Sequence, residues 1–200
     1  MTKIVFASKN RGKIKEIEAL FEGLDITTCS LNDYENVPEI LEDGCSFYEN
    51  ALKKARIVSE WTGEVVLADD SGLEVDALKG APGIYSARYA GADANDEKNI
   101  EKLLEDLKDV PREKRGSAFR CVLILYRPDG HFECFEGQWR GQIADKPVGP
   151  GGFGYDPVFF LPDLGMTVAQ LPPSLKNELS HRAKAFQKLK NTCKNTFLLK

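Results

Sequence analysis

Apolar residues recur along the chain with two different periods, and these periods predict its secondary structure. Segments of strand length that are mostly apolar or β-branched stand at residues 3–7, 25–29 and 65–68, and residues 73–76 predict another short strand. Apolar residues spaced three or four apart mark helix faces instead, within residues 14–21, 47–58, 100–107 and 179–193. Because strands and helices interleave, the pattern predicts an α/β fold around a central sheet.

Local signals place some of the element boundaries. Ser46 and Glu49 have the spacing of a capping box, in which a hydroxyl and a carboxylate satisfy free amides at a helix start. Residues 120–140 contain a Pro-Asp-Gly turn between two strand-like runs, which predicts a β-hairpin. The acidic and irregular residues 30–44 predict a long loop or a weak strand.

The bulk composition is that of an ordinary globular protein. Of 200 residues, 42% are hydrophobic and 29% are charged, so we expect a single domain over residues 1–200. The formal charge of −4 argues against a nucleic-acid binder, which would carry a basic face or tail. A local cluster of cations would still allow a small anionic ligand.

The cysteines and the N-terminus bear on the compartment. The five cysteines contain no CxxC pair, so we expect buried free thiols in a reducing cytosol: Cys29, Cys45, Cys121, Cys134 and Cys193. The apolar N-terminal stretch is too short for a signal peptide, and the longest apolar run, residues 121–126, is too short for a membrane span. We therefore expect a cytoplasmic protein with no membrane contact.

A basic segment lies between the first predicted strand and helix, and consists of Ser8, Lys9, Asn10, Arg11, Gly12 and Lys13. A helix N-terminus presents free amides and a partial positive charge, so three cations there are unfavourable unless an anion binds among them. A phosphate would be such an anion, with glycine allowing close approach of the backbone. The alternative is a solvated basic turn. A Walker loop is excluded because Ala7 and Ile14 replace residues that it requires.

Two adjacent carboxylates, Asp69 and Asp70, follow the apolar run 65–68 at a predicted turn through Ser71 and Gly72. Their mutual repulsion falls if a divalent cation binds them, and Mg²⁺ prefers such oxygens together with substrate phosphates. A carboxylate at this place could also accept a proton from water. The alternative is an acidic surface turn.

Residues 149–157 match the letters of a dinucleotide-binding fingerprint. No strong strand leads into them, and Pro157 falls where the helix of that motif would run, so we reject that function. We interpret the segment as a loop that presents Phe153 and Tyr155 to a flat ligand, with Asp156 as a hydrogen-bond acceptor. The alternative is a hairpin connection with core aromatics.

A second group of cations precedes the last predicted helix, where positive charge does not stabilise it. The group contains Lys176 and Arg182, and it suggests another anion or base site. His181 lies between them. A lone histidine is more often structural, and the neighbouring cations are what bring His181 into consideration.

Together these segments resemble the inosine triphosphate pyrophosphatases, also called non-canonical purine nucleoside triphosphate pyrophosphatases or XTP/dITP diphosphatases. The segments follow the order of that family through nearly the whole chain: residues 8–13, 47–51, 68–72, 80–89, 153–156 and 180–182. The resemblance implies a long twisted mixed β-sheet flanked by helices, two lobes with a central substrate cleft, and a homodimer. It also implies Mg²⁺-dependent hydrolysis of ITP, dITP or XTP to the monophosphate and pyrophosphate.

The resemblance implies a role for each candidate residue. Asp70 would orient or deprotonate water and would hold Mg²⁺, with Asp69 and Glu42 as further metal ligands. Residues 8–13 and Lys54 would bind the triphosphate, and Ser71 would touch the substrate. The base pocket would be formed by Phe153, Gly154, Tyr155, Asp156, Lys176, His181 and Arg182.

Three other functions stay open at this point. One is a pyrophosphatase for pyrimidine or other modified nucleotides. Another is a nucleotide-sensing module that binds without hydrolysis; the adjacent acids argue against it, because they would repel a polyphosphate in the absence of metal. The third is an RNA-binding module, which the net charge disfavours.

Overall fold

The computed structural model of the protein describes residues 2–193 and divides into two compact units. Among the described residues, unit 1 contains residues 2–70, 121–137 and 182–193, and unit 2 contains Ser71–Arg120 and Gln138–His181. Three long strands, β3 (Val65–Val75), β4 (Gly116–Tyr126) and β5 (Phe132–Ile143), each run from one unit into the other.

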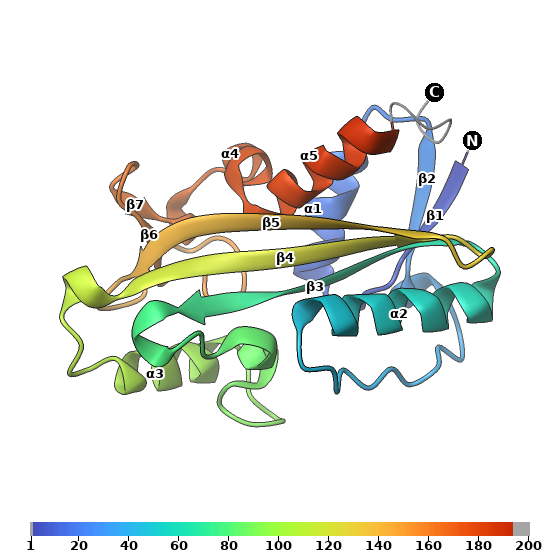
Figure 1. Cartoon of the computed structure of the whole chain (residues 1–200). Helices are drawn as coiled ribbons and strands as arrows, with labels where there is room; N and C mark the ends of the chain where they lie inside the picture. Colours follow the sequence, from blue (N-terminus) through green and yellow to red (C-terminus); the bar gives the residue numbers. More distant parts are fainter. Residues whose placement is uncertain (1, 194–200) are drawn as a thin grey trace. The chain divides into compact units, whose positions relative to one another are not determined.

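The sheet has seven strands in the order β2-β1-β3-β4-β5-β6-β7 (Figure 1). The shorter strands are β1 (Thr2–Phe6), β2 (Ile26–Ser30), β6 (Phe159–Leu161) and β7 (Met166–Thr167). β1 is parallel to β2 and β3, whereas β6 is antiparallel to β5 and β7. The mixed sheet with flanking helices confirms the predicted α/β fold.

In unit 1, helices cover both faces of the sheet. Helices α1 (Arg11–Phe21) and α5 (His181–Cys193) lie on one face and α2 (Phe47–Thr62) lies on the other (Figure 1). The face toward α1 and α5 holds a buried cluster that includes Ile17, Leu67 and Phe186. The helix α2 packs with small buried residues, Ala51 and Ala55, which let its backbone approach the sheet closely.

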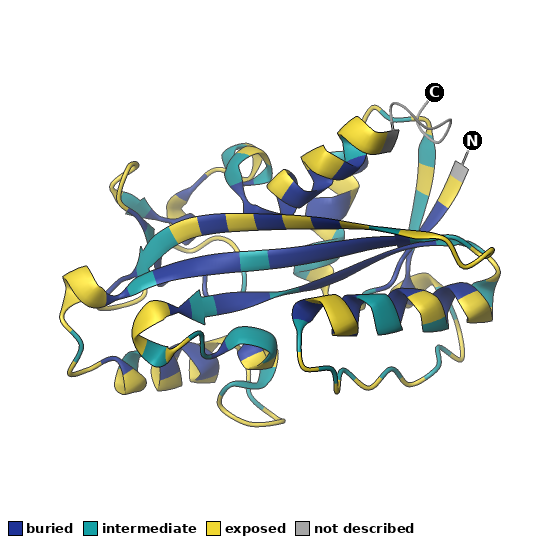
Figure 2. Cartoon of the chain, in the orientation of Figure 1, coloured by how far each residue is buried: buried dark blue, intermediate teal, exposed yellow. Residues whose placement is uncertain are grey.

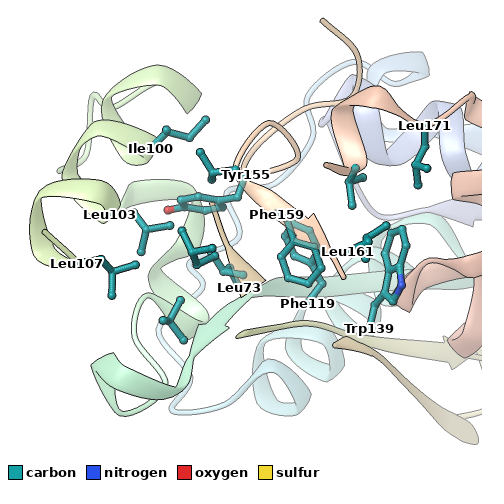
Figure 3. Close-up of a cluster of buried hydrophobic side chains, with 14 residues drawn as sticks. Leu73, Ile100, Leu103, Leu107, Phe119, Trp139, Tyr155, Phe159, Leu161 and Leu171 are labelled. Atoms are coloured by element: carbon teal, nitrogen blue, oxygen red, sulfur yellow. The ribbon is translucent and has the colours of Figure 1, made fainter. Parts of the chain in front are cut away.

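Unit 2 has its own core (Figure 3). Helix α3 (Asp96–Asp106) contributes Ile100 and Leu103 to a cluster with strand residues and with Tyr155. Phe119 and Phe159 stack at its centre, with ring centroids 4.3 Å apart. The short helix α4 (Pro173–Leu179) follows β7. This core holds the segment of residues 153–156.

The largest difference from the expected secondary structure concerns the two acids. Residues 65–68 and 73–76 were expected to be separate strands with a turn at Asp69 and Asp70. Instead β3 runs without a break from Val65 to Val75, and the acids lie inside it. Figure 2 shows this strand almost wholly buried, whereas β5 alternates between buried and exposed residues. The turn prediction is wrong because Lys13 and Arg182 stabilise the Asp69 carboxylate within the strand, while Lys54 offsets part of the cost of burying Asp70.

Other local expectations are confirmed with corrections. Ser46 caps α2, since its Oγ accepts from Glu49 N at 3.1 Å, but the Glu49 carboxylate bonds Cys45 N at 2.7 Å instead of the cap residue. The hairpin of β4 and β5 is present, closed by a bond of 2.9 Å from Arg127 N to the His131 carbonyl. No helix among residues 2–193 is long and apolar enough to span a membrane.

The described cysteines are free thiols, as expected, but most of them are not buried. Cys121 is buried and Cys29 partly so, whereas Cys45 and Cys134 are exposed. The side chain of Cys193 lies outside the described part of the chain. The expectation of buried thiols is therefore wrong for the two exposed ones.

Candidate functional site

Asp69 and Asp70 face opposite sides of the sheet, because successive side chains of a strand alternate. Asp69 contacts Lys13 of α1 and Arg182 of α5, and Asp70 contacts Lys54 of α2. These contacts lie within unit 1. The two neighbouring acids therefore lie in different environments, and each contacts a different set of cations.

Asp69 lies in a buried network of charges. Its Oδ1 accepts from Lys13 Nζ at 2.5 Å, and its Oδ2 accepts from Arg182 Nε at 2.9 Å. The Cys121 thiol donates to the same Oδ2, with Sγ at 3.2 Å, and Arg182 also pairs with Glu16. Because both Asp69 oxygens are engaged by the protein itself, the geometry favours Asp69 as the residue that orients Lys13 and Arg182.

The ionisation states follow from this arrangement. Burial opposes the charged form of Asp69, but Arg182 and Lys13 outweigh it and hold the Asp69 pKa well below its usual range. Burial likewise opposes the charge on Lys13, yet Asp69 raises the Lys13 pKa overall. Burial raises the pKa of the Cys121 thiol well above its usual value, and Asp69 adds to the effect. At neutral pH, Asp69 is ionised and Cys121 is a protonated donor.

Asp70 is buried but much less fully paired. The residue is 5% exposed, and its Oδ1 lies 3.9 Å from Lys54 Nζ. Its Oδ2 is buried and has no hydrogen-bond partner among the residues that the structure describes. Burial raises the Asp70 pKa to about 6, although Lys54 and Lys13 act in the opposite direction. A carboxyl with an open acceptor and a pKa near neutrality has the properties of a general base.

The residues around Lys54 fit a divalent cation. Lys54 pairs with Glu42 as well as with Asp70, so two carboxylates share one ammonium group. Mg²⁺ typically takes one or two carboxylates and completes its shell with water and substrate phosphates. Within residues 2–193, no three acidic, histidine or cysteine side chains form a complete metal site. The pair of carboxylates and the open Oδ2 therefore suit a cation that substrate helps to bind.

The basic segment is found where it was predicted, at the start of α1. Asn10 caps the helix, its Oδ1 accepting from Lys13 N at 3.0 Å, and Ser8 Oγ accepts from Asn10 N at 3.1 Å. Lys9 and Arg11 are exposed, whereas the Lys13 side chain turns inward to Asp69. Lys9, Arg11 and the amides at the start of α1 could thus bind an anion, and the inward-turned Lys13 adds positive charge beneath them.

The second group of predicted residues lies in unit 2. Asp156 is 2% exposed, and its Oδ2 accepts from Phe153 N at 2.9 Å and pairs with Lys176. Lys176 Nζ also lies 4.5 Å from the centre of the Phe153 ring. Gly152 has a φ of +75°, and a side chain there would collide with the Asp156 carboxylate. These contacts make the loop a firm support for Phe153, which is partly exposed.

Other predicted residues of this group are structural in their observed contacts. Tyr155 is 5% exposed, and its hydroxyl donates to the Ser86 carbonyl at 2.8 Å. Its ring is part of the core and offers no stacking surface, as the core-aromatic alternative predicted (Figure 3). His181 is buried with its ring stacked on Phe119, the centroids being 4.9 Å apart. Gly154 N donates to Asp96 Oδ2 at 2.6 Å.

The structure therefore divides the predicted site residues into two sets. Unit 1 holds residues 8–13, Glu42, Lys54, Asp69, Asp70 and Arg182. Unit 2 holds Ser71, residues 153–156, Lys176 and His181.

Sequence reasoning missed two members of the first set. Glu16 could have been found, because it stands three residues after Lys13 on a predicted helix and so shares its face. Nothing in the sequence around Cys121 indicates that its thiol reaches Asp69.

Comparisons with known proteins agree with the geometry. The Ham1 family model matches residues 4–192. A dITP/XTP pyrophosphatase of Geobacter sulfurreducens is 52% identical over 191 residues, which cover 96% of each chain. A HAM1 protein of Coxiella burnetii has a TM-score of 0.89 at 40% identity, over 98% of this chain and 100% of that one. A nucleoside-triphosphatase or dITP/XTP pyrophosphatase of Mycobacterium abscessus has a TM-score of 0.75 at 42% identity, over 94% and 97% of the two chains.

These matches run through both units and include every segment on which the sequence resemblance rests. Two of them combine high coverage with at least 40% identity in a solved structure. The chain therefore belongs to the Ham1 family.

Proposed function

We propose that this protein hydrolyses the non-canonical purine nucleoside triphosphates ITP, dITP and XTP to the monophosphate and pyrophosphate. The observation that carries the proposal is Asp70, a buried carboxylate with an open oxygen and a pKa raised to about 6. Relatives about half identical in sequence are named dITP/XTP pyrophosphatases, which supports the substrate class.

The hydrolysis of a phosphoanhydride needs a positioned water and compensation of the phosphate charge. The open Oδ2 of Asp70 would accept a hydrogen bond from the attacking water and then its proton. Lys9, Arg11 and the amides at the start of α1 would bind the triphosphate. Lys54 would add a cation from α2, on the same face of the sheet as Asp70.

We also propose that Asp70 and Glu42 hold Mg²⁺. When bound, Mg²⁺ would neutralise part of the negative charge on the triphosphate and on the leaving pyrophosphate. The bound cation would also reduce the cost in folding stability of burying the Asp70 charge. Asp69 serves as the anchor for Lys13 and Arg182 in this account, because both of its oxygens are already engaged.

For unit 2, we propose a role in holding the purine. Phe153 offers a partly exposed ring, backed by the ammonium group of Lys176. Donors that face a 6-oxo group would be left unpaired by the 6-amino group of adenine. Each unpaired group costs about 1–3 kcal/mol, which is enough to disfavour ATP.

A substrate panel tests the proposal. We expect Mg²⁺-dependent release of pyrophosphate from ITP, XTP and dITP, with little release from ATP. Release of orthophosphate, or equal turnover of ATP and dTTP, would overturn the proposed reaction or substrate class. Nucleotide binding without turnover would favour a sensing module instead. Sedimentation velocity tests the homodimer that the family resemblance implies.

A further inference from the structure

The segment that carries Glu42 is attached to α2 by a contact at each of four consecutive residues. Asp43 Oδ1 lies 2.5 Å from Lys53 Nζ, and Cys45 N donates to Glu49 Oε2 at 2.7 Å. Between them, Gly44 N donates to Asn50 Oδ1 at 2.8 Å, and Glu42 itself pairs with Lys54. The segment thus runs antiparallel along the helix, residues 42 to 45 meeting residues 54 to 49. Figure 1 shows the chain before α2 passing along that helix.

Asn50 makes the most buried of these contacts. The residue is 1% exposed, whereas the side chain of Asp43 is 66% exposed. A Cβ on Gly44 would lie 2.7 Å from Asn50 Oδ1 and 2.8 Å from Glu49 Cβ, so the backbone approaches α2 too closely for a side chain. Asn50 therefore holds the segment at a contact that water cannot easily replace.

The other end of the same side chain is unusual. Asn50 Nδ2 is buried and has no hydrogen-bond partner within residues 2–193. A buried donor left unpaired costs about 1–3 kcal/mol, so an asparagine kept only for stability would be a poor choice at this position. Asn50 and Lys54 stand four residues apart on α2 and share one face of that helix, the face that Glu42 and Asp70 meet.

We infer that Asn50 is a positioning residue of the pyrophosphatase site, which fixes Gly44 and thereby holds Glu42 in place to bind the divalent cation with Asp70. The inference rests on the proposed function. Removing a side chain that holds a metal ligand in position, without touching the metal, typically weakens metal binding by about 10–100-fold. Without the bond to Asn50, the segment would be held only by the Glu42–Lys54 ion pair and by the more exposed contacts of Asp43 and Cys45.

Asn50→Leu tests this inference, because leucine has a similar volume and removes both polar ends. Asn50→Leu removes the unpaired donor but leaves Gly44 N without its acceptor, so these two effects partly cancel and the melting temperature reports whether the fold is intact. Asp43→Asn is the matched control, since it alters an exposed contact of the same segment. Gly44→Ala perturbs the Asn50 contact from the loop side and should act like Asn50→Leu.

Two measurements need no turnover. Hydrogen–deuterium exchange of residues 42–45 reports the attachment of the segment, and electron paramagnetic resonance of Mn²⁺ reports cation binding. We expect Asn50→Leu to accelerate the exchange and to weaken Mn²⁺ binding about tenfold, with Asp43→Asn close to wild type in both. Unchanged exchange in Asn50→Leu, or faster exchange with Mn²⁺ affinity within twofold of wild type, would overturn the inference.

Glu42→Gln separates this inference from the proposed function. If Glu42→Gln weakens Mn²⁺ binding and Asn50→Leu does not, the metal site stands and the role of Asn50 is refuted. If Glu42→Gln leaves Mn²⁺ binding unchanged, the metal assignment itself fails, and the positioning role fails with it. If both variants remain folded and bind Mn²⁺ more weakly, the result supports both the metal site and the positioning role of Asn50.

Discussion

Replacing Asp70 by asparagine should stabilise the metal-free protein while abolishing its activity. The carboxyl is 5% exposed, and its pKa is raised from 3.8 to about 6, so the folded state disfavours its charge. A shift of this size corresponds to about 3 kcal/mol at neutral pH. Asparagine stands in for the neutral carboxyl and removes that penalty. The figure is an upper limit, because the amide brings donors that need partners.

Thermal unfolding measures the effect. For a chain of this length, about 3 kcal/mol corresponds to an increase in melting temperature of about 6–12 °C at pH 7 without divalent cations. The sign with pH follows from the raised pKa: the penalty is absent below about pH 4, grows between about pH 4 and 6, and is complete above that. The difference in melting temperature between Asp70→Asn and the wild type should therefore vanish near pH 4.

Asp43→Asn provides the control, because its carboxylate is exposed and should give no stabilisation. Adding Mg²⁺ should stabilise the wild type more than Asp70→Asn, since the cation offsets the buried charge. A melting temperature for Asp70→Asn equal to or below that of the wild type at pH 7 would show that burial of the Asp70 charge does not destabilise the fold. So would a difference between the two proteins that does not change with pH.

Further predictions concern the buried network and the phosphate site. Arg182→Met should cost about 3–5 kcal/mol in urea unfolding, because it leaves two buried carboxylates with less compensation; a cost under 1 kcal/mol would contradict this. Because Arg182 and Lys13 hold the Asp69 pKa below its usual value, the free energy of unfolding should fall as pH decreases below about 4, and Asp69→Asn should lose that dependence. Lys9→Ala and Arg11→Ala should each raise the KM for the triphosphate about tenfold, and unchanged KM values would exclude the start of α1 as the phosphate site.

Much of the fold could be predicted from local patterns. Periodicity identified β1, α1, α2 and the β4–β5 hairpin, because each is amphipathic or apolar over its own length. The course of β3 through Asp69 and Asp70 could not be predicted in this way. Local sequence shows two acids that break an apolar run. The strand continues because cations distant in sequence neutralise Asp69 and partly compensate Asp70.

The candidate site shows the same limit. The Ser8–Lys13 segment was found because helix electrostatics is local. The different environments of Asp69 and Asp70 depend on strand alternation together with tertiary contacts, which residue spacing does not contain. Tyr155 looked like a binding residue because its glycine-rich context suggested an open loop, yet its ring completes the core of unit 2. Asn50 was visible in the sequence as part of a family segment, but its bond to Gly44 required coordinates.

The most direct test compares pyrophosphate release from dITP by the wild type and by Asp70→Asn, each with and without Mg²⁺. We expect metal-dependent release by the wild type, and folded Asp70→Asn protein that binds dITP without measurable turnover. Turnover by Asp70→Asn near the wild-type rate would contradict the central claim that Asp70 activates the attacking water.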